Sequence, residues 1–118
     1  MQAGINAALD DLASHLAAKV EAGQLPLEEA LPHLELAFHT PMGGDGLIIS
    51  YLSLLPIDDR PRLDRLLAEP DPDKRKRCIE VLGAREDDQL VPFFFKAMSD
   101  SVKDVVVVAI HQIGKLPS

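Results

Sequence analysis

The four histidines are the residues best suited to binding a metal or moving protons, and their spacing favours neither role. They are His15, His33, His39 and His111. Metal-binding histidines on one helix lie three or four residues apart, so that both rings share a face. His33 and His39 are six residues apart, with Glu35 between them, and could meet only if the chain bends near Pro32. We therefore predict no metal site.

The single cysteine is the one nucleophile of high intrinsic reactivity. Cys78 falls on the same helical face as Val81 and Leu82, and no histidine stands near it in the sequence to lower its pKa. We predict that Cys78 is a small buried hydrophobic residue. One cysteine excludes an internal disulfide and is typical of a reducing compartment, which predicts a cytoplasmic protein.

Two further segments carry groups that bind phosphate in other proteins. The run Gly43–Gly46 is rich in glycine but lacks the lysine and the spacing of a phosphate loop, so we predict a flexible connection. The basic run Lys74–Arg77 points around most of a helix, and nearby acids are placed to pair with it. We therefore expect no nucleic-acid binding, no catalytic residue and no cofactor.

An internal repeat predicts the architecture that positions these groups. Residues 59–84 and 90–115 match at an offset of 31, with Leu82-Gly83 falling on Ile113-Gly114 and Pro61 falling on Pro92. A repeat of this length is typical of stacked helical hairpins. Hydrophobic residues make up 47% of the 118 residues and aromatic residues only 4%, which favours aliphatic packing between helices.

Periodicity and capping residues predict about seven helices and no strand. Residues 5–22 carry one apolar stripe, formed by Ile5, Leu9, Leu12, Leu16 and Val20. The next helix runs from Pro26 to Phe38 and is kinked or divided by Pro32. The loop Thr40–Gly44 follows, and we predict a hinge there.

Polar caps mark the helices of the second half. We expect Asp45, Asp58 or Asp59, Asp71, and Asp87 or Asp88 to open successive helices. Ser101 with Asp104 predicts a capping box for the last helix. The valines from Val105 to Val108 favour a strand by propensity, but the cap before them and the glycine after them favour a helix, which we predict.

Residues 69–100 resemble a known repeat family. They contain the turn Glu69–Asp73, then Cys78, Val81 and Leu82-Gly83, and later Val91-Pro92 and Ala97-Met98. This pattern is similar to the HEAT-like repeat of the phycobilisome-lyase type, in a small bacterial-type member. The resemblance implies an all-α fold, a short α-solenoid of HEAT-like hairpins. It also implies that Arg75 pairs with a carboxylate of the neighbouring repeat.

The resemblance also implies the domain organisation. We expect residues 1–118 to form a single domain, with residues 1–40 as an N-terminal helical hairpin cap and residues 45–118 as HEAT-like repeats. Lys74 and Val106 depart from the family pattern, which usually has Val and Arg at these positions. The His-Glu steps of the iron-binding members are missing from this chain. The resemblance therefore implies the family's fold and interactions but not its enzymology.

Charge and the last helix point to protein binding. The net charge of −7 lies almost entirely in residues 1–56, which hold seven acids and one base, and this excess repels phosphates and membrane surfaces. No apolar run is long enough to span a membrane. The last helix is apolar nearly all round and needs cover, by a partner, by a second copy in a homodimer, or by the N-terminal hairpin.

We therefore expect a non-enzymatic protein–protein interaction module whose partner is another protein. The predicted contact residues are Arg62, Arg65, Phe93, Lys96, Val106 and Val107. Phe93 and Val107 fall off the expected core stripe, which predicts exposed anchors. Two alternatives stay open, an inhibitor or immunity-type protein that neutralises a toxin or basic enzyme, and an accessory subunit of a lyase-type enzyme.

Overall fold

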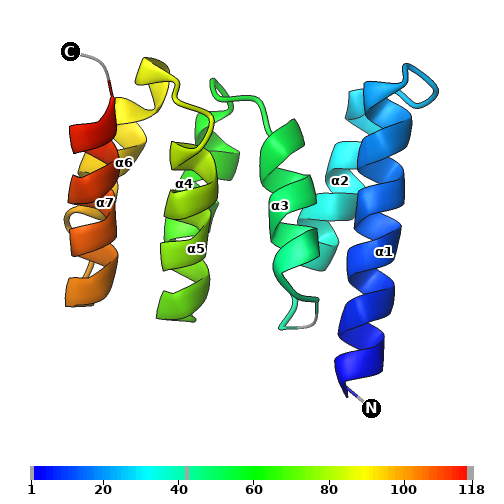
Figure 1. Ribbon diagram of the computed structural model, residues 1–118, viewed down its shortest axis with the longest axis horizontal. Helices are drawn as coiled ribbons and strands as arrows, with labels where there is room; N and C mark the ends of the chain where they lie inside the picture. The colour runs from blue at the N-terminus through cyan, green and yellow to red at the C-terminus, as the bar shows by residue number, and fades with distance from the viewer. Residues whose placement is uncertain (1, 42, 117–118) are drawn as a thin grey trace. The chain divides into compact units, whose positions relative to one another are not determined.

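A computed structural model describes residues 2–41 and 43–116, with side chains placed from residue 7 onward. Within these residues the fold is all-α, as predicted, and contains no strand (Figure 1). The helices are α1 (Gln2–Glu21), α2 (Leu27–Phe38), α3 (Asp45–Leu54), α4 (Arg60–Leu67), α5 (Pro72–Gly83), α6 (Val91–Ala97) and α7 (Lys103–Lys115), and a 3₁₀ turn, η1 (Asp88–Leu90), precedes α6.

Packing divides the chain into two compact units, Met1–Leu55 and Pro56–Ser118. The first contains α1 to α3, and the second contains α4 to α7. Because α3 packs against both α1 and α2, the loop Thr40–Gly44 lies inside the first unit. The structure thus groups α3 with the N-terminal hairpin rather than with the repeats. That the whole chain is one domain stays a prediction.

The core of the first unit forms where α2 and α3 meet. Leu31, Leu34 and Phe38 of α2 are buried. The Phe38 ring lies 4.9 Å from the ring of Tyr51 in α3. Pro32 sits within one continuous helix, with its ring on the exposed side, so α2 is not divided.

The predicted apolar stripe of α1 is partly wrong. Leu12 is 62% exposed, whereas Ala13 and Ala17 are buried. Leu9, Leu16 and Val20 flank the two alanines and are half-buried, and the predicted Ile5 lies outside the described side chains. Alanine leaves room for close contact between helices. The buried face of α1 is therefore centred on Ala13 and Ala17, and Leu12 points toward solvent.

The start of α3 is capped by a residue from α1. The Asp10 carboxylate oxygen Oδ1 accepts hydrogen bonds from the backbone N–H groups of Gly44 (2.8 Å) and Leu47 (3.0 Å). The prediction that Asp45 caps this helix is therefore wrong, because Asp45 is already the first helical residue. A Cβ at Gly44 would lie 2.7 Å from Asp10 Oδ2, so this glycine allows the cap to approach.

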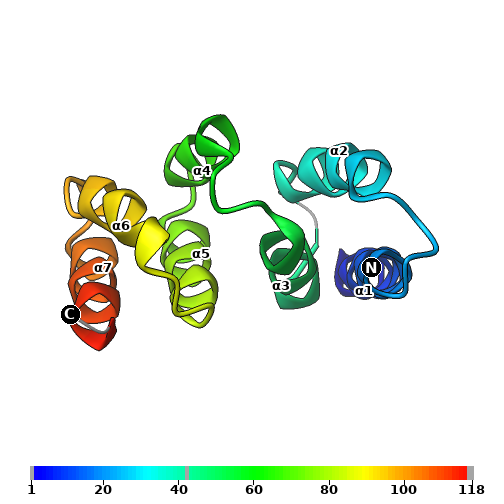
Figure 2. The ribbon, with the colours of Figure 1, turned by 90° about the horizontal axis from the view of Figure 1, so that it is seen from above.

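The second unit repeats its backbone as the sequence does. Helix α4 begins at Arg60 and α6 at Val91, while α5 begins at Pro72 and α7 at Lys103; both offsets are 31 residues. Helices α4 and α6 form one layer and α5 and α7 the other (Figure 2). The four-valine run lies in α7 and is helical, as predicted.

Three of the predicted caps in this unit are confirmed, and one is wrong. Asp59, Asp71 and Asp87 each accept a hydrogen bond from a backbone N–H at the start of their helix or turn. Helix α7 has Val102 as its N-cap, with no side-chain cap from Ser101. Instead, Asp100 accepts a hydrogen bond from the Val102 N–H at 2.9 Å.

Candidate binding surfaces

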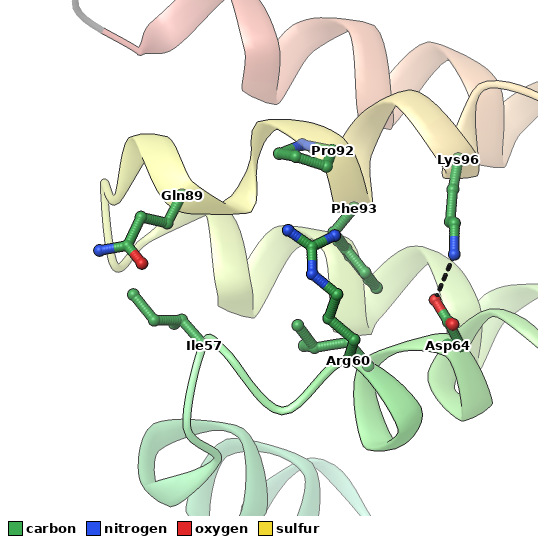
Figure 3. A pocket seen from close by; sticks show the side chains of 8 residues that line it. Ile57, Arg60, Asp64, Gln89, Pro92, Phe93 and Lys96 are labelled. Carbon is green, nitrogen blue, oxygen red and sulfur yellow. Dashed lines mark hydrogen bonds and ion pairs between the residues drawn. The ribbon is translucent and has the colours of Figure 1, made fainter.

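A groove runs between α4 and α6 on the second unit (Figure 3). One wall carries Arg60, Leu63 and Asp64 of α4, and the other carries Pro92, Phe93 and Lys96 of α6. The residues of each wall lie about one turn apart, so their side chains share one helical face. The groove therefore combines an apolar floor, formed by Leu63 and Phe93, with charged edges.

The charges of the groove are distributed unevenly. Lys96 Nζ lies 2.8 Å from Asp64 Oδ1, and both side chains are more than half exposed, so this ion pair contributes little stability. The Arg60 side chain is exposed and forms no hydrogen bond or ion pair with any residue that the structure describes. Figure 3 shows its guanidinium beside Phe93, away from the Lys96–Asp64 pair. The middle of the groove thus carries a positive charge that no described side chain neutralises.

The predicted exposure of Phe93 is wrong. Phe93 is only 5% exposed, whereas its neighbour Phe95 is 57% exposed. Helix α6 packs against α7 on one side and α4 on the other. Phe93 and Phe94 are therefore both buried, because α6 has a buried face on each side. A prediction based on one apolar stripe assumes a single buried face.

Of the predicted contact residues on α4 and α6, the groove brings together Phe93 and Lys96. Arg62 turns back along its own helix, and its Nη1 lies 2.7 Å from Asp59 Oδ2. Arg65 is exposed but does not line the groove. Sequence reasoning missed Arg60, whose only signal was its place one turn before Asp64 on the predicted helix.

The outer face of α7 is the second candidate surface. Val107 is 54% exposed, Ile110 is 50% exposed and Val106 is half-buried. The residues 31 positions before Ile110 and Ile113 are Ile79 and Leu82 of α5, which are fully buried. Helix α7 covers α5, but within the described residues nothing covers the matching face of α7 to the same degree.

The glycines show the same difference between the two helices. Gly83 of α5 is buried against Gln112 of α7; a Cβ at Gly83 would lie 2.4 Å from Gln112 Cδ. Gly114, 31 residues later, has no described atom within 4 Å of where its Cβ would be. Among the described residues, the position in α7 that is equivalent to the contact between Gly83 and Gln112 is therefore open.

A buried ion pair joins the two hairpins of the second unit. Arg75 Nε and Nη2 donate to the two carboxylate oxygens of Asp100, at 2.8 and 3.1 Å. Arg75 Nη1 donates to the backbone oxygen of Glu69 at 2.5 Å. A carboxylate from the neighbouring repeat was the expected partner of Arg75, and the geometry confirms it.

The environment of Asp100 stabilises its ionised carboxylate form. Partial burial alone would raise the pKa of the Asp100 carboxyl, but the hydrogen bonds from Arg75 and from the Val102 N–H outweigh burial. The pKa is therefore held below its usual value. Elsewhere in the basic run, Lys74 Nζ lies 2.6 Å from Glu69 Oε1, so the run is largely neutralised by nearby acids.

The remaining candidate for a reactive side chain, Cys78, lies in the core. Cys78 is fully buried, and burial raises the pKa of its thiol to about 12, so the thiol is protonated at neutral pH. Among the described residues, no three His, Cys, Asp or Glu side chains gather as a metal-binding group. None of the described helices combines the length and apolar character needed to cross a bilayer.

Comparison with protein-family models, with curated proteins and with solved structures gives no match for this chain. The assignment to HEAT-like repeats therefore stays a prediction, carried by the internal repeat and its motifs.

Proposed function

We propose that this chain is a non-enzymatic protein–protein interaction module, and that the outer face of α7 is one of its contact surfaces. The observation that carries the proposal is the difference between α5 and α7. Ile79 is fully buried beneath α7, while its counterpart Ile110 is half exposed. An apolar helical face of this kind favours cover by another helix.

The outer face of α7 is too small to form a stable interface by itself. Helix α7 has 13 residues, so its outer strip is roughly 20 Å long and 10 Å wide. This is a fraction of the roughly 800 Å² that each partner of a stable interface buries. We therefore expect the face to be one part of a larger interface, with a partner protein or with a second copy of this chain.

The proposal is tested by changing the face without changing the core. Because Val107 and Ile110 are about half exposed, the double variant Val107→Ser/Ile110→Ser should fold normally and lose partner capture from native lysate, as well as any self-association seen by sedimentation. The matched control is Leu12→Ser/Leu36→Ser, which removes two exposed leucines from the first unit. Equal capture by wild type and the α7 variant would contradict the proposal, and a monomer at high micromolar concentration would exclude the homodimer.

A further inference from the structure

The groove between α4 and α6 has features that the α7 face lacks. Its floor is apolar, with Leu63 and Phe93 each 5% exposed, and its edges are polar. The centre of the α7 face is formed by Val107, Ile110 and Gly114. The groove can therefore distinguish ligands by charge as well as by shape, which is how polar edges give specificity to an apolar site.

We propose that this groove binds an extended, acidic polypeptide segment, with a carboxylate paired to Arg60 and a neighbouring apolar side chain packed on Phe93. Arg60 is the one cation of the groove without a described partner, and a guanidinium binds carboxylates in a fixed, two-pronged geometry. Beside it, Phe93 and Pro92 offer an apolar contact. The charge of Arg60 and the apolar floor of the groove together favour a ligand in which acidic and apolar side chains alternate.

The other charges of the groove argue against a nucleic acid as the occupant. Lys96 is neutralised by Asp64, and Arg62 by Asp59, which lies outside the groove. A phosphate backbone needs several uncompensated cations in a row, whereas the groove offers one.

The form of the groove argues for a chain segment rather than a small molecule. The space within it has a volume of only about 20 Å³, far below the roughly 300 Å³ at which small-molecule sites begin. A small ligand would leave much of its surface in water. A segment lying along the groove would instead contact both walls, from Ile57 and Gln89 at one end to the Lys96–Asp64 pair at the other (Figure 3).

The experiment is an amide NMR titration of the full chain with capped tetrapeptides of alternating leucine and glutamate, leucine and lysine, or serine and glutamate. We expect the leucine–glutamate peptide to give saturating shifts at residues of α4 and α6, with a dissociation constant on the order of 1 mM. The lysine peptide and the serine peptide should each bind at least severalfold more weakly.

A charge reversal tests the role of Arg60. Arg60→Glu places an acid in the first turn of α4, where a helix accepts one, and should reverse the preference so that the lysine peptide binds more tightly. The matched control is Lys103→Glu, which makes the same change in net charge at an exposed position on α7. It should leave the preference intact.

Four outcomes would overturn the proposal. They are the absence of saturating shifts up to about 10 mM peptide, equal binding of the glutamate and lysine peptides, equal effects of Arg60→Glu and Lys103→Glu, and inorganic phosphate reproducing the peptide's shifts. Failure here would leave the proposed function standing, because the α7 variants test a different surface.

Discussion

At the scale of single residues, Arg75 and Asp100 form the best-satisfied polar contact of the second unit. Their side chains are 11% and 8% exposed, and Arg75 also donates to the backbone oxygens of Glu69 and Pro70. The same carboxylate accepts the Val102 N–H just before α7. One ion pair thus joins the turn before α5, the start of α7 and the loop between α6 and α7.

Removing the guanidinium should therefore destabilise the chain in a pH-dependent way. Arg75→Gln leaves Asp100 buried without its cation, and we expect a loss of about 3 kcal/mol of unfolding free energy at pH 7. The lowered pKa of Asp100 means that its contribution is fully present above its unfolded pKa of about 3.9 and is lost as the pH falls through the folded value.

The measurement is urea unfolding of wild type and Arg75→Gln between pH 7 and pH 3. The stability difference between the two proteins should shrink toward the acid end. Arg77→Gln serves as the control, because Arg77 pairs with Glu80 only at 3.8 Å and both side chains are substantially exposed; its effect should be below about 1 kcal/mol. A difference for Arg75→Gln that is constant across this pH range would contradict the account.

At the scale of elements, the contact between α5 and α7 depends on Gly83. A Cβ at this position would lie 1.9 Å from Gln112 Oε1 and 2.9 Å from its Cγ, and Gln112 is only 5% exposed. The carboxamide therefore rests directly on the glycine backbone. The absence of a side chain at Gly83 therefore determines how closely α5 and α7 approach each other.

We predict that the effect of Gly83→Ala changes sign with the residue at position 112. In wild type it should destabilise by about 1–3 kcal/mol, because the buried glutamine must move. In the Gln112→Ala background the clash is gone, and the higher helix propensity of alanine should make the change neutral or stabilising. Gly114→Ala, at the open equivalent position, should stabilise in either background. Thermal unfolding of the set checks this, and identical effects of Gly83→Ala in both backgrounds would contradict it.

Local signals made the second unit more predictable than the first. The caps Asp59, Asp71 and Asp87 act on backbone groups a few residues away, so spacing located Asp71 and limited each of the other two to a pair of adjacent aspartates. Asp10 caps a helix more than thirty residues later, and no local pattern encodes such a contact. The predicted exposure of Leu12 and Phe93 was wrong for a related reason. Each side chain belongs to a helix that packs against two other helices, and the positions of those two helices decide which of its side chains are buried.

The candidate site shows the same limit. Phe93 and Lys96 were predicted as contact residues, and they do line the groove. The prediction missed Arg60, because an arginine at the start of a helix is common and only the position of α6 gives it a role. Arg62 pairs with Asp59 and does not line the groove, which spacing on the predicted helix did not show.

At the scale of the whole molecule, the two compact units raise the question of whether they unfold together. The first depends on the Asp10 cap, which lies entirely within α1 and α3. The second depends on contacts such as that between Gly83 and Gln112, which lies entirely within α5 and α7. A defect in one unit therefore touches no described contact that stabilises the other.

We predict that Asp10→Ala, which removes a cap worth about 1 kcal/mol, lowers amide hydrogen-exchange protection in α1 to α3 and leaves α4 to α7 unchanged. Gly83→Ala should do the reverse. Asp11→Ala is the control, because Asp11 is exposed on the same helix and has no described part in the cap; it should alter neither unit. If Asp10→Ala lowered protection equally in all seven helices, the units would unfold as one cooperative structure, as expected of the single domain that the sequence predicted.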